Sequence, residues 1–310
     1  MTERMSSERR IVESKFVERQ VRIMETKEYP AIWLQTAGCT GCSVSLLNVI
    51  NPSIKNLLVD EVLPGSHINL RFHPTVMAGS GSPMIEAMVD TSQTKKKGYI
   101  LIVEGAIPTA KGGIHGVVGE KDGRPMTMKS WVETLAADAL AVIALGSCAA
   151  FGGIPAAYPN PTQCRSVGEV LQAKGIDTPL VNIPGCPPHP DWFVGTVATI
   201  LLSGLPSSED LDELRRPKAF YGQTIHENCP RRAYYDENKF AKKFGDPGCN
   251  YELGCRGPIT HADCPVRLWN NKTNWCVGCG ATCIGCTEPE FFDISPLYEK
   301  VSEVALPEEV

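Results

Sequence analysis

The amino-acid sequence predicts an α/β fold, in which a mainly parallel sheet with helices on both faces is followed by an irregular, cysteine-rich region. Short apolar runs alternate with helical patterns up to about residue 205, as in βαβ units. After residue 205, Pro, Gly, Asn and Cys become frequent and long apolar runs disappear. Several of the 13 cysteines directly follow apolar runs in the first region, and most of the others gather in the second.

These observations divide the chain into three parts. Residues 1–29 are charged and interrupted, which predicts an N-terminal tail or helix. Residues 30–205 carry the predicted sheet, and residues 206–310 form the irregular region. A chain of 310 residues is long enough for two domains, but the second has too few apolar runs to be held together by a large core.

The first βα unit begins with an apolar run at residues 31–36, which predicts a buried strand. A glycine-containing turn follows at residues 37–42, and residues 43–49 have a helical pattern. The turn carries Cys39 and Cys42 just before the helix, where a thiolate is favoured. It therefore suits a pair of metal ligands, although a thioredoxin-like dithiol is also compatible with Cys-x2-Cys at this position.

Four further strands are predicted at residues 67–72, 99–103, 139–145 and 180–183, and helices around residues 84–91, 130–135 and 192–202. The last two strands lead into cysteine turns, at Cys148 and Cys186. Because the carboxyl ends of parallel strands lie along one edge of a sheet, Cys39, Cys42, Cys148 and Cys186 are expected to converge. A single free cysteine is often only a small buried apolar residue, but that interpretation explains four cysteines at strand ends poorly.

Charge and hydropathy argue against several classes of function. The chain has 30 basic and 35 acidic residues, a net charge of −5 and no basic stripe, so no nucleic-acid partner is expected. No apolar run reaches 18 residues, so no transmembrane segment is predicted. Arg9-Arg10 precedes a charged stretch that is unlike an export signal, which predicts a cytoplasmic protein that associates with membranes only through partners. Without a Walker loop or Gly-x-Gly-x-x-Gly, nucleotide binding is not supported.

Residues 275–286 contain four cysteines: Cys276, Cys279, Cys283 and Cys286. An odd total of 13 cysteines in a long chain argues against a disulfide framework. Structural zinc usually takes two Cys-x2-Cys pairs separated by a longer loop, whereas closely spaced pairs favour an iron–sulfur cluster. The run therefore predicts metal binding, with iron–sulfur preferred and zinc as the alternative.

Further candidate ligands precede this run: His226, Cys229, Cys249, Cys255 and Cys264. Their spacing suits metal sites that join the ends of loops and so stabilise them, since such loops have low intrinsic stability. A lone histidine is more often a surface residue, but His226 stands three positions before Cys229, which favours a ligand role.

Specific motifs recur along the chain: Cys39-Thr-Gly-Cys42, Phe72-His-Pro-Thr75, Val103-Glu-Gly105, Gly146-Ser-Cys148, Phe-Gly-Gly-Ile-Pro-Ala-Ala at 151–157, Pro184-Gly-Cys-Pro-Pro-His-Pro190, His226-Glu-Asn-Cys229 and Cys283-Ile-Gly-Cys286. With these motifs, the sequence from about Trp33 to Cys286 resembles the small subunits of nickel–iron hydrogenases. Val44, where a glutamate is common, and Trp275-Cys276, where Trp-Pro is common, are most similar to the branch in which selenocysteine can occur in the large subunit.

The resemblance implies a flavodoxin-like α/β domain followed by an irregular domain, with three iron–sulfur clusters in a line. The implied ligands are Cys39, Cys42, Cys148 and Cys186 for a proximal 4Fe-4S cluster; His226, Cys229, Cys249 and Cys255 for a distal 4Fe-4S cluster; and Cys264, Cys283 and Cys286 for a medial cluster. Where many relatives of the medial site have proline and a 3Fe-4S cluster, this chain has Cys276, so a 4Fe-4S medial cluster is expected, with Cys279 as the rival fourth ligand. Cys164 is expected to be unligated.

The resemblance also implies partners. A large catalytic subunit would hold the nickel–iron centre, in a heterodimer or a dimer of heterodimers, and an external electron acceptor or donor would exchange electrons with this chain. Trp33, Phe72 and residues 107–117 are expected to face the large subunit. Oxygen-tolerant relatives have two extra cysteines where this chain has Gly41 and Gly153, so no extra redox step is expected. A stand-alone ferredoxin-like carrier and a zinc-stabilised interaction module are the alternative functions.

Overall fold

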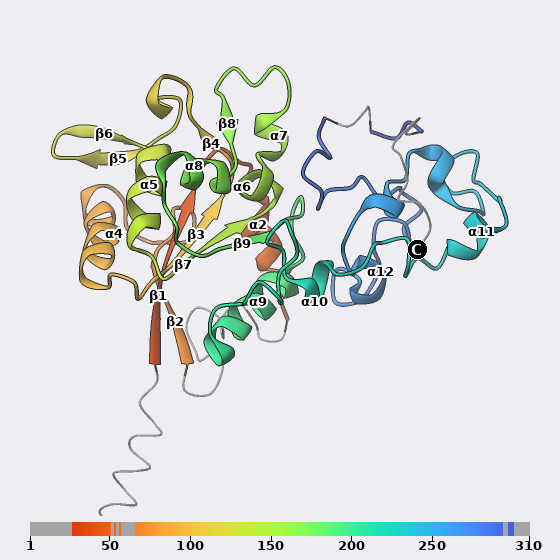
Figure 1. The fold of residues 1–310 in the computed structure, drawn as a ribbon, viewed down its shortest axis with the longest axis horizontal. Helices are drawn as coiled ribbons and strands as arrows, with labels where there is room; N and C mark the ends of the chain where they lie inside the picture. The colour runs from red at the N-terminus through yellow and green to blue at the C-terminus, as the bar shows by residue number, and fades with distance from the viewer. Residues whose placement is uncertain (1–26, 51–52, 54–55, 57–65, 294–296, 301–310) are drawn as a thin grey trace, which may run out of the picture.

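The computed structural model describes residues 27–50, 53, 56, 66–293 and 297–300 (Figure 1). Most of the tail predicted at residues 1–29 lies outside this range, but the first strand already begins at Lys27. The main sheet has five parallel strands in the order β2-β1-β3-β7-β9, which is the 2-1-3-4-5 order of flavodoxin-like folds. Its strands are β1 (Lys27–Gln35), β2 (Ser66–Phe72), β3 (Ile100–Glu104), β7 (Ala141–Leu145) and β9 (Leu180–Ile183). The predicted fold class is confirmed.

Both faces of the sheet are buried, because alternate residues of each strand point to opposite sides. Leu101 and Val103 of β3 belong to one core, while Ile100 and Ile102 belong to the other. The first core is covered by three helices, which are α4 (Ser82–Thr94), α5 (Met128–Asp138) and α8 (Val167–Lys174). The second core packs α2 (Gly41–Leu46) and α9 (Pro190–Ser203) together with apolar side chains from residues 221–283, so the cysteine-rich region rests against this face.

Several elements in the first region are additional to those predicted. A two-strand ladder joins β4 (Ile107–Pro108) to β8 (Cys164–Arg165), and a hairpin joins β5 (Val117–Lys121) to β6 (Arg124–Thr127). The short helices η1 (Ala110–Gly113), α6 (Ser147–Phe151) and α7 (Gly153–Ala156) follow the carboxyl ends of strands. Helix α8 begins with a capping box, in which Ser166 and Glu169 satisfy each other's backbone amides.

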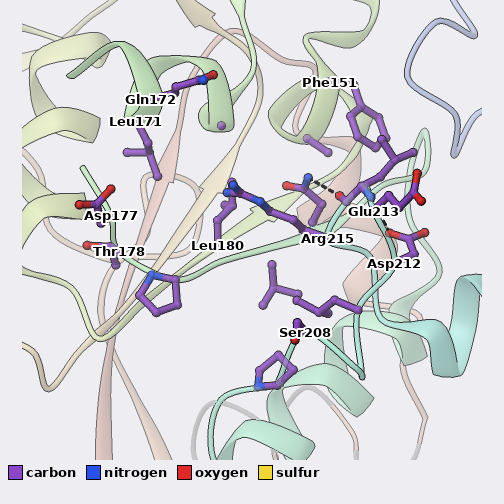
Figure 2. Close-up of a pocket in the computed structure, with 18 of the residues that line it drawn as sticks. Phe151, Leu171, Gln172, Asp177, Thr178, Leu180, Ser208, Asp212, Glu213 and Arg215 are labelled. Atoms are coloured by element: carbon purple, nitrogen blue, oxygen red, sulfur yellow. Dashed lines mark hydrogen bonds between the residues drawn. The ribbon is translucent and has the colours of Figure 1, made fainter. Parts of the chain in front are cut away.

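The edge strand β9 is partly covered by residues 211–215. Asn182 N donates to Arg215 O at 2.9 Å, and the Asn182 side-chain amide donates to Leu214 O at 2.8 Å. A cavity of about 740 Å³ lies here, between α8 and residues 206–215 (Figure 2). Among the described residues that line it there is no cysteine or histidine, so it is separate from the predicted metal ligands.

The region after residue 205 consists mainly of turns, joined by isolated bridges such as Thr224 with His261 and Phe240 with Cys249. Its helical turns are α10 (Lys218–Tyr221), α11 (Arg232–Asp236), η2 (Asn250–Leu253), η3 (Gly257–Ile259) and α12 (Cys264–Arg267). The predicted change from a regular sheet to an irregular region is therefore present. The division into two domains at residue 205 stays a prediction. No described helix is long and apolar enough to cross a membrane.

Candidate metal centres

The four cysteines at the strand ends lie close together. Cys39 and Cys42 occupy the turn between β1 and α2, Cys148 is in α6 after β7, and Cys186 follows β9. Burial, together with the charges of Cys186 and Cys39, raises the pKa of Cys148 to about 12. The pKa of Cys42 is also raised, by burial, by Glu104 and by the three other thiols. A cation at this position would relieve that repulsion, and thiolates are the form that binds metal.

The Glu104 side chain holds the first cysteine turn in place. Its buried carboxylate accepts hydrogen bonds from Cys42 N and Ser43 N, each at 3.1 Å, and from the Trp33 indole at 2.9 Å. The Ser43 hydroxyl also donates to it. These bonds connect the end of β3 to the start of α2, so the positions of Cys39 and Cys42 are coupled to the sheet.

Glycines at the strand ends let the thiols approach the backbone. A Cβ at Gly146, whose φ is +87°, would lie 2.4 Å from Cys42 Sγ. A Cβ at Gly153 would lie 2.9 Å from Cys148 Sγ, and one at Gly41 would lie 3.1 Å from Cys39 Sγ. The two glycines at the expected positions of extra cysteines therefore both border this group of thiols.

A second group is formed by His226, Cys229, Cys249 and Cys255, which line one small cavity. The pKa of Cys255 is raised by burial and by the charges of Cys249 and Cys229. The His226 ring packs edge-on against Tyr235, with ring centres 4.5 Å apart. Burial lowers the pKa of His226, which favours the neutral imidazole that ligates metals.

A third group lies between the first two. Burial raises the pKa of Cys264, and the charges of Cys286 and Cys276 raise it further. The pKa of Cys286 is raised to about 12, mainly by burial; the Cys186 amide lowers it and the charge of Cys276 raises it. The charge of Cys286 also raises the pKa of the buried Cys283. The structure thus brings Cys276 near Cys264 and Cys286, whereas Cys279 acts on Cys276 alone among these thiols; Cys276 and Cys279 are both exposed.

Two buried polar side chains flank this third group. The Trp269 indole faces the Cys264 thiol, which is the acceptor beside it. Thr282 Oγ1 is buried without a hydrogen-bond partner and directly precedes Cys283. Buried donors usually have acceptors, and the sulfur atoms of an iron–sulfur cluster would supply them. The donor set therefore fits such a cluster. Among the described residues, no three His, Cys, Asp or Glu side chains are placed as ligands of a single metal ion.

The three groups adjoin in order. Cys283 N donates to Cys255 Sγ at 3.4 Å, and Arg256 N donates back to Cys283 O at 2.8 Å. The Cys186 amide contacts Cys286, which joins the first group to the third. Cys164 is buried and contacts the Thr162 hydroxyl at 3.2 Å. Its charge raises the pKa of Cys148. Its role as an unligated thiol stays a prediction.

The residues expected to face a partner are only partly exposed. Trp33 and Phe72 are fully buried in the two cores, and Ile107 is buried with them, so their assignment to a partner surface is wrong. Trp33 and Phe72 lie on strands, and their side chains point into the cores on the two faces of the sheet. Of the large apolar residues at 107–117, Ile114 and Val117 are exposed. Other large apolar side chains are exposed after the carboxyl ends of strands, and they are Val44, Leu47, Val76 and Ile154.

Comparisons with known proteins show the family of this chain. Residues 221–298 match the C-terminal family model of the NiFe/NiFeSe hydrogenase small subunit, and residues 39–200 match the model of the NADH ubiquinone oxidoreductase 20 Kd subunit. The chain is 48% identical over 282 residues to the periplasmic NiFeSe hydrogenase small subunit of Desulfomicrobium baculatum, covering 88% of this chain and 87% of that one. It is 40% identical over 292 residues to the periplasmic NiFe hydrogenase small subunit of Solidesulfovibrio fructosivorans, covering 92% and 86%.

Solved structures give the same result. The reduced, active NiFeSe hydrogenase of Desulfomicrobium baculatum superposes with a TM-score of 0.83 at 48% identity, covering 88% of this chain and 100% of that one. The oxidised recombinant NiFeSe hydrogenase of Desulfovibrio vulgaris Hildenborough superposes with a TM-score of 0.82 at 44% identity, covering 88% and 98%.

These comparisons also correct one prediction. Three relatives are named as periplasmic proteins, which contradicts the predicted cytoplasmic location. That prediction rested on the lack of an apolar segment after Arg9-Arg10, and such a lack does not determine a compartment. The alternative of a stand-alone ferredoxin-like carrier finds no support among these relatives. The chain belongs to the small subunits of the NiFe and NiFeSe hydrogenases, and it is the electron-transfer subunit of a heteromeric oxidoreductase whose partner is a large subunit.

Proposed function

We propose that this chain conducts electrons through three iron–sulfur clusters between its large subunit and an external redox partner. The proposed ligands are Cys39, Cys42, Cys148 and Cys186 at the proximal site, Cys264, Cys276, Cys283 and Cys286 at the medial site, and His226, Cys229, Cys249 and Cys255 at the distal site. The observation that carries the proposal is that the three groups of side chains adjoin in this order. Iron–sulfur clusters supply one-electron transfer when bound.

The proximal side is proposed to bind the large subunit. Val44, Leu47, Val76 and Ile154 are each more than half exposed, and each follows the carboxyl end of a strand. Exposed apolar side chains gathered on one side of a domain are typical of a protein interface. The cysteines at the same strand ends would then lie next to the catalytic subunit, in a heterodimer or a dimer of heterodimers.

The distal side is proposed to face the external partner. His226 is half-buried, so part of the His226 side chain in this group is open to solvent. Neutral imidazole in place of thiolate makes a cluster less negative, which tends to raise its reduction potential. His226→Ala should slow electron exchange with an external acceptor more than hydrogen–deuterium exchange at the large subunit.

The medial site is proposed to hold a 4Fe-4S cluster, because Cys276 adds a fourth thiolate near Cys264 and Cys286. Cys276→Pro should then produce the electron paramagnetic resonance (EPR) signal of an oxidised 3Fe-4S cluster, which the parent protein should lack. The matched control is Cys279→Ala, which should leave the spectrum unchanged. A 3Fe-4S signal in the carefully prepared parent, or its appearance only in Cys279→Ala, would contradict this assignment.

Purification of the intact complex from its native host tests the function as a whole. We expect a large subunit to co-purify, iron sufficient for three clusters, and reduction of those clusters by hydrogen. We expect one proximal oxidation step, because Gly41 and Gly153 stand where extra cysteines would be needed. A protein that contains zinc instead of iron, or that is isolated as a fully clustered monomer, would overturn the proposal.

A further inference from the structure

The hydroxyl of Ser147 lies where the proximal and medial ligand groups meet. Ser147 is 1% exposed and directly precedes Cys148 in the turn after β7. Its Oγ accepts a hydrogen bond from Gly185 N at 2.8 Å, and its own proton is donated to Cys286 O. One hydroxyl therefore joins three segments that each carry a proposed ligand.

The direction of these bonds follows from the chemistry of the groups. A backbone amide can only donate and a carbonyl can only accept, so the single proton of the hydroxyl must point to Cys286 O. The turn is braced further by its backbone, because Ser147 N donates to Gly185 O at 3.0 Å and Gly146 N donates to Ile183 O at 2.9 Å. These backbone bonds connect only the two proximal turns. Of the bonds described here, the one that leads from them to the Cys286 carbonyl comes from a side chain.

The junction between the medial and distal groups is built differently. There, Cys283 N donates to Cys255 Sγ and Arg256 N donates to Cys283 O, so both bonds come from backbone amides. A side-chain substitution leaves those amides in place. The proximal–medial junction also has one backbone contact, from the Cys186 amide to Cys286, but its link to the Cys286 carbonyl is lost when one oxygen atom is removed.

We propose that Ser147 is a positioning residue that fixes the proximal ligand turns against the medial ligand loop. This hydroxyl adds a second link beside the contact of the Cys186 amide with Cys286, and the two links together set the separation of the two ligand groups. This inference rests on the proposed function, because it assumes that both groups hold clusters. The exchange of electrons between two carriers depends on their separation, so Ser147 would act on the relay without touching a metal.

The test compares Ser147→Ala with Ser147→Thr, which keeps the hydroxyl, in the intact complex. The matched control is Ser45→Ala, because Ser45 is also buried and donates to Pro188 O at 2.8 Å, but does not reach the medial loop. Three quantities are measured: the iron content, the hydrogen-exchange rate of the Gly185 amide, and the spin–spin interaction between the reduced proximal and medial clusters by EPR.

We expect Ser147→Ala to keep its iron, since every ligand remains. The Gly185 amide should exchange about fivefold faster, which corresponds to one lost hydrogen bond of roughly 1 kcal/mol. The EPR interaction should weaken in Ser147→Ala and keep its parental strength in Ser147→Thr and Ser45→Ala. An unchanged interaction in Ser147→Ala, or an equal loss in Ser45→Ala, would overturn the inference.

Two further outcomes are decisive. If Ser147→Ala loses iron, the EPR interaction in Ser147→Thr is the deciding measurement. An interaction of parental strength supports the positioning role, and a weakened one contradicts it. If the parent itself contains no iron, the proposed function fails. The Gly185 exchange rate in the iron-free chain then tests the hydroxyl contact by itself, and an unchanged rate in Ser147→Ala overturns it.

Discussion

The two regions of this protein place cysteines by different physical means. In the sheet region, the cysteine turns follow β1, β7 and β9, and the residues of β7 and β9 are all buried. In the region after residue 205, the cysteines lie on turns and on helices of at most five residues among those described. The first group of ligands is thus held by a hydrophobic core, and the other two by local hydrogen bonds and by whatever metal they bind.

This difference indicates that metal contributes unequally to the stability of the two regions. Strands whose apolar residues are buried on both faces keep their arrangement without a ligand. Short turns have little core of their own, so a bound cluster would supply much of their folding free energy. The three predictions below test this contrast, from the largest expected effect to the smallest.

The largest effect is expected on removal of iron from the complex. Amides of the cysteine-rich region, such as Ala241 N and Cys249 N, should lose most of their protection from hydrogen exchange. Amides of β3 and β7 should stay protected, because their strands lie in the core. Hydrogen exchange followed by mass spectrometry checks both regions in one experiment. An equal loss of protection in the two regions would contradict the contrast.

A smaller effect is expected for Arg216→Met. The guanidinium of Arg216 is buried and binds Asp212 at 2.7 Å, Glu288 at 3.0 Å and Thr287 O at 3.0 Å. It therefore connects the segment that covers β9 to the loop after Cys286. Removing one partner of a buried ion pair costs about 3–5 kcal/mol, so the midpoint of denaturant unfolding should fall markedly.

The control for Arg216 is Arg232→Met. Arg232 pairs with Asp236 at 2.8 Å, but both side chains are about half exposed. Exposed pairs contribute about 0–1 kcal/mol. A similar loss of stability in the two variants would show that the buried network does not hold this region.

The smallest effect is expected for Glu104→Gln in the sheet region. The substitution removes the charge that accepts bonds from Cys42 N, Ser43 N and Trp33, which should lower the free energy of unfolding by about 1.5–3 kcal/mol. The iron content should stay at the parental value, because β1, β7 and β9 still place the four cysteines. Calorimetry and metal analysis check these points, with the exposed Glu237→Gln as control. Loss of proximal iron would mean that the sheet alone does not hold this group of ligands.

The sequence was sufficient to predict the sheet, because each central strand is a continuous apolar run that ends at a glycine or cysteine turn. The convergence of Cys39, Cys42, Cys148 and Cys186 followed from the parallel arrangement alone. Cys276 was predicted as a medial ligand from the family resemblance, and the structure places it near Cys264 and Cys286. The ligand assignments themselves stay predictions.

Other features were missed for identifiable reasons. The ladder of β4 and β8 has two residues per strand, too few for a periodic pattern. Helix α8 could have been found, since Ser166 and Glu169 form a capping box and Gly175 ends the helix. Ser147 and Glu104 carry no sequence signal for their contacts, because their partners are 139 and 62 positions away and come together only in the folded chain.

The reciprocal hydrogen bonds between Cys255–Arg256 and Cys283 also bear on how the protein matures. Because each segment bonds to the other, ordering one of them by metal lowers the entropy that the other must lose when its own metal arrives. The gain is mutual, as thermodynamic linkage requires. Loading of the distal and medial sites should therefore be cooperative, so that partly assembled chains tend to have both sites filled or both empty.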